Sequence, residues 1–150
     1  MCGIAGSTQT NQQALVAMQS ELVHRGPDGD GLWLDDASGT GLSHTRLKVI
    51  DLSDDAAQPM TSANGRYVLT FNGEIYNFKE LRSELEKAGT SFRSNSDTEV
   101  LLELLARDGT SALEKLVGMF AFALWDKEKR ELILARDRLG IKPLVYAPLV

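Results

Sequence analysis

The chain has 150 residues, 43% of them hydrophobic, which suits one globular domain with a buried core. Its 16 basic and 21 acidic side chains give a formal net charge of −5, and the basic ones are scattered singly, which argues against nucleic acid or an anionic membrane as the main partner. The sequence has no apolar run long enough to span a bilayer and no signal peptide, so we expect a cytoplasmic location.

The first third of the chain predicts one helix followed by two strands. After an apolar stretch at 2–7, the residues Thr-Asn-Gln-Gln at 10–13 have the form of a capping box, and apolar side chains at helical spacing continue to Leu22. Strand candidates follow at 31–34 and 41–47. The helix is therefore expected to precede these two strands in the chain.

The middle third predicts a hairpin followed by two helices. Asn72-Gly73 separates strand candidates at 67–71 and 74–76, and Asn-Gly is the strongest short hairpin signal. One helix is expected over 77–89, where a glycine ends it in the left-handed conformation. Another is expected over 96–109, and its many leucines leave little polar face. This last helix should therefore be packed between other elements.

The last third predicts mainly strands. A short helix is expected over 111–117, and strands over 119–125, 131–135 and 144–147, with a polar turn at 126–129 between the first two strands. Strands stand in blocks with the helices grouped between them, rather than in strict alternation. This order favours an α+β sandwich of mainly antiparallel sheets with helices outside.

No repeat, low-complexity tract or linker divides the sequence, so we expect a single domain over residues 1–150. The one cysteine excludes an internal disulfide, and His24 and His44 add no metal-ligand cluster of recognisable spacing. We therefore expect no metal ion in this chain.

The position of that cysteine, Cys2, suggests a nucleophile. A lone cysteine in a cytosolic domain is commonly a small buried hydrophobe. However, an initiator methionine before a small second residue is normally trimmed, which would leave a thiol and a free α-amine on Cys2. An α-amine has a pKa of about 7.7–8.0, so a useful fraction is neutral near pH 7 and can take the thiol proton. Both interpretations stay open on the residue alone.

A thiolate that attacks an acyl carbon also needs hydrogen-bond donors where negative charge develops. The Asn72 side-chain amide and the Gly73 backbone N–H, placed together at the predicted hairpin tip, are candidates for this oxyanion hole. The alternative is that Asn72-Gly73 only closes a hairpin, and the two interpretations are compatible.

Taken together, the motifs resemble the glutaminase domain of class II glutamine amidotransferases, and within them the asparagine synthetase family. The resemblance covers almost the whole chain, and the stretches that carry it occur in the family's order. They are CGIAG at 2–6, HRGPDGDG at 24–31, SHTRLKVIDLS at 43–53, QPM at 58–60, FNGEIYNFKELR at 71–82, SDTEVLLELL at 96–105, GMFAFALWD at 118–126 and ARDRLGIKPL at 135–144.

This resemblance implies a function and a set of catalytic residues. Cys2 would attack the side-chain amide of L-glutamine, giving a thioester and ammonia, and water would then release glutamate. Asn72 and Gly73 match the oxyanion-hole pair of the family. The chain would thus be a glutaminase, the ammonia-supplying half of a glutamine-hydrolysing asparagine synthetase.

The resemblance also implies how glutamine is held. Arg46 matches the residue that binds the substrate α-carboxylate, although a surface salt bridge is its alternative role. Glu74 and Asp97 match the positions that hold the substrate ammonium, although Asp97 also suits the first turn of a helix. Backbone groups of Val49 and Ile50 line the same pocket in the family. The substrate-binding set is therefore Arg46, Val49, Ile50, Glu74 and Asp97.

Two other motifs are expected to have supporting roles. The segment around His24 would pack near the active site and support it, without His24 acting as a base. Residues 136–138, Arg-Asp-Arg, would form a structural charge network beneath the sheet.

The family's fold is the N-terminal-nucleophile hydrolase fold, a four-layer αββα sandwich. The family's domain normally continues with further strands and a helix, which leaves three alternatives for this chain: a C-terminally truncated fragment, a compact stand-alone glutaminase, or a subunit that delivers ammonia to a separate partner. If C-terminal strands are missing, we expect an exposed edge that associates with a second copy or a partner. No synthetase domain is expected within 1–150, so this chain should need no cofactor, and ATP and Mg would belong to a synthetase domain or subunit that receives the ammonia.

The competing hypothesis is a non-catalytic glutamine-binding or protein-interaction module that retains the fold. The presence of Cys2 together with the matched binding residues favours the enzyme, because a binding module would need no terminal nucleophile.

Overall fold

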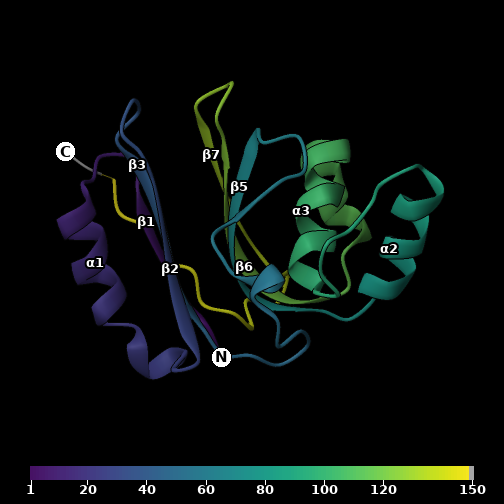
Figure 1. Cartoon of the computed structure of the whole chain (residues 1–150), viewed down its shortest axis with the longest axis horizontal. Helices are drawn as coiled ribbons and strands as arrows, with labels where there is room; N and C mark the ends of the chain where they lie inside the picture. The colour runs from purple at the N-terminus through teal and green to yellow at the C-terminus, as the bar shows by residue number, and fades with distance from the viewer. Residues whose placement is uncertain (149–150) are drawn as a thin grey trace.

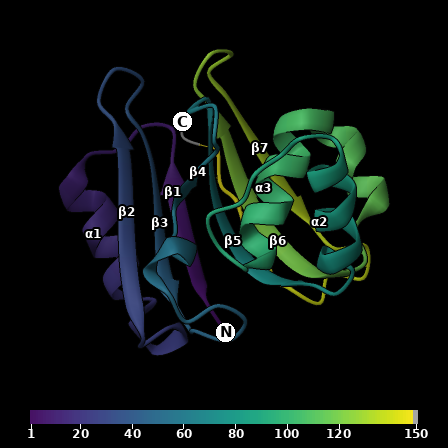
Figure 2. The same ribbon diagram turned by 45° about the vertical axis from the view of Figure 1, so that its right-hand side comes forward.

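A computed structural model, which describes residues 1–148, has four layers (Figure 1). Two antiparallel sheets face each other, α1 covers the outer face of one, and α3 covers the outer face of the other with α2 packed against α3 (Figure 2). The strands are β1 (Gly3–Ser7), β2 (Gly29–Asp35), β3 (Thr40–Arg46), β4 (Met60–Thr61), β5 (Tyr67–Ile75), β6 (Gly118–Asp126) and β7 (Glu131–Arg136). The α-helices are α1 (Gln12–Ser20), α2 (Phe78–Lys87) and α3 (Asp97–Asp108), and short 3-10 helices lie at Val23–Arg25, Asp54–Ala56 and Gly109–Lys115. The predicted αββα sandwich is therefore confirmed.

The strand order is β1-β3-β2 in the first sheet and β4-β5-β6-β7 in the second. β3 and β5 lie inside their sheets, and Thr70 of β5 donates a hydrogen bond across the interface to the carbonyl oxygen of Ser43 in β3, at 3.0 Å. β1 is therefore an edge strand whose start lies beside the central strand β3.

Two apolar cores hold these layers together. The larger lies between the second sheet and its helices, and the leucines of α3 are buried in it on nearly every side, as the sequence predicts. The smaller lies between the sheets and contains Leu42, Val68, Ala123 and Trp125. The second sheet has buried apolar side chains on both faces, so it is closely packed and gives the active-site cavity a rigid base.

One prediction is wrong in a way that matters for the site: Asn72-Gly73 does not form a hairpin. β5 runs unbroken from Tyr67 to Ile75 and pairs with β6 in one continuous register. Neither Asn72 nor Gly73 has the positive φ that a tight Asn-Gly turn requires. A side chain at Gly73 would collide with the backbone of Met119 and Phe120, so the glycine serves close approach of two strands.

Other differences are smaller. Residues 144–147 form no strand, and the helix expected over 111–117 is the 3-10 helix Gly109–Lys115. Asn11, and not Thr10, caps α1, because its side chain accepts the N–H of Ala14 at 2.9 Å. The two-residue strand β4 was not expected. Within residues 1–148, no helix combines the length and the apolar character needed to cross a bilayer.

Candidate active site

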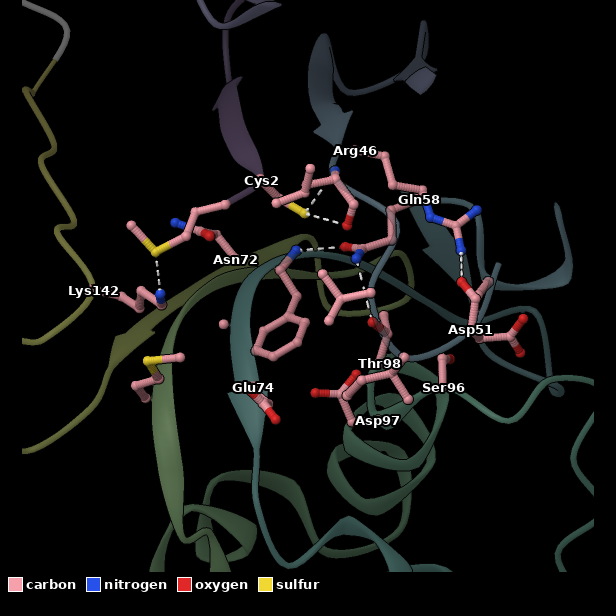
Figure 3. Close-up of a pocket in the computed structure, with 18 residues that line it drawn as sticks. Cys2, Arg46, Asp51, Gln58, Asn72, Glu74, Ser96, Asp97, Thr98 and Lys142 are labelled. Carbon is pink, nitrogen blue, oxygen red and sulfur yellow. Dashed lines mark hydrogen bonds between the residues drawn. The ribbon is translucent and has the colours of Figure 1, made fainter. Parts of the chain in front are cut away.

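A cavity of about 130 Å³ opens between the two sheets where β1 begins and β3 ends (Figure 3). It is lined by side chains or backbone from β3, β5, the start of α3 and the loops beside them. All eight residues predicted for the site line it: Cys2, Arg46, Val49, Ile50, Asn72, Gly73, Glu74 and Asp97.

Cys2 stands immediately before β1, and its half-buried thiol lies against the end of β3. The backbone N–H of Leu47 donates to Sγ at 3.4 Å, and Sγ lies 3.8 Å from the carbonyl oxygen of the same residue. Both contacts come from one residue, so the thiol is held in a defined place facing the cavity. Met1 also lines the cavity, and its sulfur accepts a hydrogen bond from the ammonium of Lys142.

Two hydrogen-bond donors in β5 line the same cavity as this thiol. The Asn72 side chain is buried but makes no hydrogen bond with another group in residues 1–148, so its amide is free to donate. The Gly73 N–H lies on the same strand edge as the N–H groups two residues before and after it. Phe71 N–H donates to Gln58 Oε1 at 2.7 Å and Ile75 N–H to Asp97 Oδ2 at 3.0 Å, which places the Gly73 N–H between them at the cavity.

Arg46 ends β3 and is 8% exposed. Its two terminal nitrogens donate to backbone carbonyl oxygens, Nη1 to Ser53 at 2.8 Å and Nη2 to Asp51 at 2.6 Å. No carboxylate within residues 1–148 pairs with it, so the alternative of a surface salt bridge is wrong. The positive charge therefore stays available for an anionic ligand, in a fixed orientation.

Val49 and Ile50 lie in the loop after β3, with side chains 68% and 37% exposed. Arg46 holds this loop from inside, and the Asp51 carboxylate accepts the N–H of Asn95 at 2.7 Å from the segment before α3. The loop therefore forms one wall of the cavity and is tied at both sides.

Asp97 and Glu74 supply negative charge on the other wall. Ser96 caps α3 by accepting the N–H of Glu99, so Asp97 is the first helical residue. Burial raises the pKa of the Asp97 carboxyl from its ordinary 3.8 to about 6, N–H donors such as that of Ile75 lower it, and the nearby Glu74 charge raises it. Asp97 thus bears a charge that the fold disfavours until a cation arrives.

Neither histidine lines the cavity. His44 is buried between the sheets, both its ring nitrogens lack a hydrogen-bond partner within residues 1–148, and burial lowers its pKa to about 4. Within the described part of the chain, no three Cys, His, Asp or Glu side chains converge as a metal site.

The segment 24–31 supports the site, as predicted, by packing against the end of β3. Asp28 N–H donates to the Arg46 carbonyl oxygen at 2.9 Å, and the Asp28 carboxylate accepts the N–H of Lys48 at 3.0 Å. A side chain at Gly26 would collide with the backbone of Thr45 and Arg46. His24 itself lies outside the cavity.

The Arg-Asp-Arg segment is not a charge network. The Asp137 carboxylate accepts the backbone N–H groups of Phe120, Ile141 and Lys142 at 2.9–3.1 Å, and neither neighbouring arginine pairs with it. Burial would raise the pKa of Asp137, but these N–H donors lower it to about 2. Asp137 therefore fastens the loop after β7 to β6.

Gln58 and Lys142 are among the cavity residues that the sequence interpretation missed. Gln58 joins β5 to α3, since its Oε1 accepts the N–H of Phe71 and its Nε2 donates to Thr98 Oγ1 at 3.3 Å. Lys142 is only 2% exposed and reaches the cavity from the loop after β7. The quoted motifs QPM and GIKPL contain both residues, but no spacing rule assigns them to the cavity.

Comparisons with known proteins identify the family of the chain. A family model described as "Glutamine amidotransferase domain" matches residues 1–149. The chain is 45% identical to asparagine synthetase [glutamine-hydrolyzing] 1 of Bacillus subtilis over 154 residues, 97% of this chain and 24% of that protein. It is 46% identical to a putative asparagine synthetase [glutamine-hydrolyzing] of Mycobacterium tuberculosis over the same shares of both chains. The chain thus spans about a quarter of the length of these curated relatives.

Solved structures are similar as well. Glutamine phosphoribosylpyrophosphate amidotransferase from B. subtilis is 26% identical, with a TM-score of 0.74 over 95% of this chain and 38% of that one. The allosteric regulatory enzyme of purine biosynthesis has a TM-score of 0.81 at 24% identity over the same shares, which is a likeness of fold.

Proposed function

This chain belongs to the glutamine amidotransferase domain family, and on that premise we propose that it hydrolyses the side-chain amide of L-glutamine through a thioester on Cys2. One observation carries the proposal: a thiol, two free N–H donors, a buried arginine and two carboxylates line one cavity. A non-catalytic module would need the charged groups but not the thiol beside the donors.

Substrate binding follows from the charges of the two walls. Glutamine has an α-carboxylate that suits the Arg46 guanidinium and an α-ammonium that suits Glu74 and Asp97. Val49 and Ile50 cover the ligand from the loop. With both ends of the amino acid held, the side-chain amide extends toward Cys2.

The reaction begins when the Cys2 thiol loses its proton to the α-amine of the same residue, which requires that Met1 be removed. The sulfur electron pair then attacks the amide carbon, and Asn72 and Gly73 donate hydrogen bonds to the oxygen that becomes negative. The carbon–nitrogen bond breaks, the nitrogen takes the proton from the α-amine, and ammonia leaves. Water cleaves the resulting thioester, giving glutamate and restoring the thiol.

The ammonia is proposed to pass to a synthetase domain or subunit. The curated relatives are named as glutamine-hydrolysing asparagine synthetases, and this chain matches about a quarter of their length. We propose that residues 1–150 form one amidotransferase domain that needs no cofactor of its own, and that ATP and Mg act only on the synthetase side. A cytoplasmic location, where a thiol stays reduced, and association with a second copy or a partner stay predictions.

Cys2→Ala tests the proposal, because alanine is also small and leaves the same α-amine after methionine removal. We expect the purified wild-type chain to release glutamate from glutamine and Cys2→Ala to release none, while calorimetry still detects glutamine binding to the variant. Lys129→Met, an exposed change in the β6–β7 turn, is the matched control and should behave as wild type. Equal glutamate release by Cys2→Ala would contradict the thioester route.

A further inference from the structure

Lys142 is a buried cation in the active-site cavity to which the mechanism above gives no role. Its side chain is only 2% exposed, and its ammonium donates to the sulfur of Met1, directly beside Cys2 in the chain. In Figure 3, Lys142 lies on the same side of Cys2 as Asn72, and Arg46 lies on the other side. The two cations of the cavity therefore have different surroundings.

The position of Lys142 is fixed by its own backbone. Asp137 accepts the N–H of Lys142 at 3.0 Å and that of Phe120 in β6 at 3.1 Å, so one carboxylate fastens the lysine to the second sheet. The Asp137 N–H also donates to the Phe120 carbonyl oxygen at 2.7 Å. The loop after β7 is thus a rigid bracket that holds Lys142 beside the start of β1.

The charge of Lys142 lacks a compensating partner. Within the part of the chain that the structure describes, no carboxylate lies within ion-pair distance of its ammonium. The Asp137 carboxylate is occupied by backbone N–H groups. Burial of an unpaired ammonium costs free energy of folding. We therefore expect a group in the cavity whose charge or reactivity this ammonium changes.

The group it acts on changes when Met1 is removed. The methionine sulfur leaves, and the new terminus is the α-amine of Cys2, a residue that lines the same cavity as Lys142. The resting terminus carries an ammonium and a thiol, whereas the active form has one proton fewer. Positive charge nearby favours the form with fewer protons, whether the remaining proton is on nitrogen or on sulfur.

We propose that Lys142 is a positioning residue whose fixed positive charge favours the deprotonated, reactive form of the N-terminal Cys2. The proposal rests on the proposed function and adds to it the group that activates the nucleophile. Other charged groups line the same cavity: Arg46 from β3, Asp51 from the following loop, Glu74 from β5 and Asp97 from α3. A change at Lys142 leaves these four side chains in place.

The test uses the fact that Cys2 is the only cysteine of the chain. The rate of alkylation of the thiol by iodoacetamide, measured between pH 5.5 and 9 on protein that has lost Met1, reports the reactive fraction without any turnover. Lys142→Met keeps an unbranched side chain that is one atom shorter and removes the charge, Lys142→Arg keeps the charge, and Lys129→Met is an exposed control. All four proteins are compared by circular dichroism.

We expect the midpoint of the alkylation profile to rise by about one pH unit in Lys142→Met, because one positive charge of the cavity is lost, and to stay near wild type in the other two variants. Coincident profiles for wild type and Lys142→Met would overturn the proposal. Retention of Met1 in the protein isolated from its natural source would also overturn the proposal, because Lys142 would then contact the methionine sulfur. A wild type that releases glutamate but shows coincident profiles would overturn this inference alone, and the proposed function would stand.

Discussion

Replacing Asp97 by asparagine should stabilise the protein while removing a substrate contact. The folded chain raises the pKa of this carboxyl from 3.8 to about 6, so its ionised form is less favourable in the folded than in the unfolded state. This cost is absent below pH 3.8, grows as the pH rises toward 6, and is complete above it. Asparagine keeps an oxygen that can accept the Ile75 N–H, now at 3.0 Å, and has no charge to bury.

The magnitude follows from the same difference. At about 1.36 kcal/mol per pH unit, the difference between 3.8 and about 6 corresponds to roughly 3 kcal/mol at neutral pH. Since Asp97 is only 5% exposed, little of this is screened by solvent. Asp97→Asn should therefore unfold at a higher urea concentration than wild type at pH 7.5, and at nearly the same concentration at pH 4.

Urea unfolding without glutamine, followed by circular dichroism at both pH values, measures this effect. Asp36→Asn is the matched control, because Asp36 is exposed in the turn after β2 and its replacement should change the unfolding free energy by less than about 0.5 kcal/mol. An Asp97→Asn variant that is less stable than wild type at pH 7.5, or a difference that does not depend on pH, would show that burial of the Asp97 charge does not destabilise the fold. The same variant should bind glutamine more weakly, because one of two anions facing the ammonium is lost.

Two further predictions concern the walls of the cavity. Arg46→Lys loses the planar guanidinium that donates to the carbonyl oxygens of Ser53 and Asp51. Steady-state kinetics should show a KM for glutamine at least about tenfold higher with a smaller change in kcat, and an unchanged KM would contradict the role of Arg46. Gln58→Leu leaves the buried N–H of Phe71 unpaired and should lower the free energy of unfolding by about 1–3 kcal/mol, whereas Gln58→Glu keeps the acceptor; equal stability of Gln58→Leu and wild type would count against this bridge.

Local signals predicted the helices well, because their ends depend on nearby residues. Ser96 caps α3 and Gly89 follows α2 with a φ of 96°, as their residue types indicate. The same kind of signal failed at Asn72-Gly73, where pairing with β6 keeps the chain extended. Asn-Gly prefers a turn locally, but pairing with a long partner strand keeps these residues extended. The dipeptide alone carries no information about that partner strand.

The sequence predicted part of the cavity lining, but not how the site is arranged. The resemblance to a family supplied Arg46, Glu74 and Asp97, and the structure brings them into one cavity. The role of the Gly73 N–H depends on which edge of β5 it faces, and this follows only from the hydrogen bonds of its neighbours. Lys142 was missed because a lysine in sequence normally indicates an exposed residue, and its burial here results from the Asp137 bracket.

Intact-mass spectrometry shows whether Cys2 is an N-terminal nucleophile. The purified chain is weighed before and after treatment with a glutamine-like electrophile, and the adduct is located by peptide mapping. We expect loss of Met1 and one covalent adduct on Cys2, which excess glutamine prevents. Retention of Met1 with no adduct on Cys2 would show that Cys2 is not an N-terminal nucleophile.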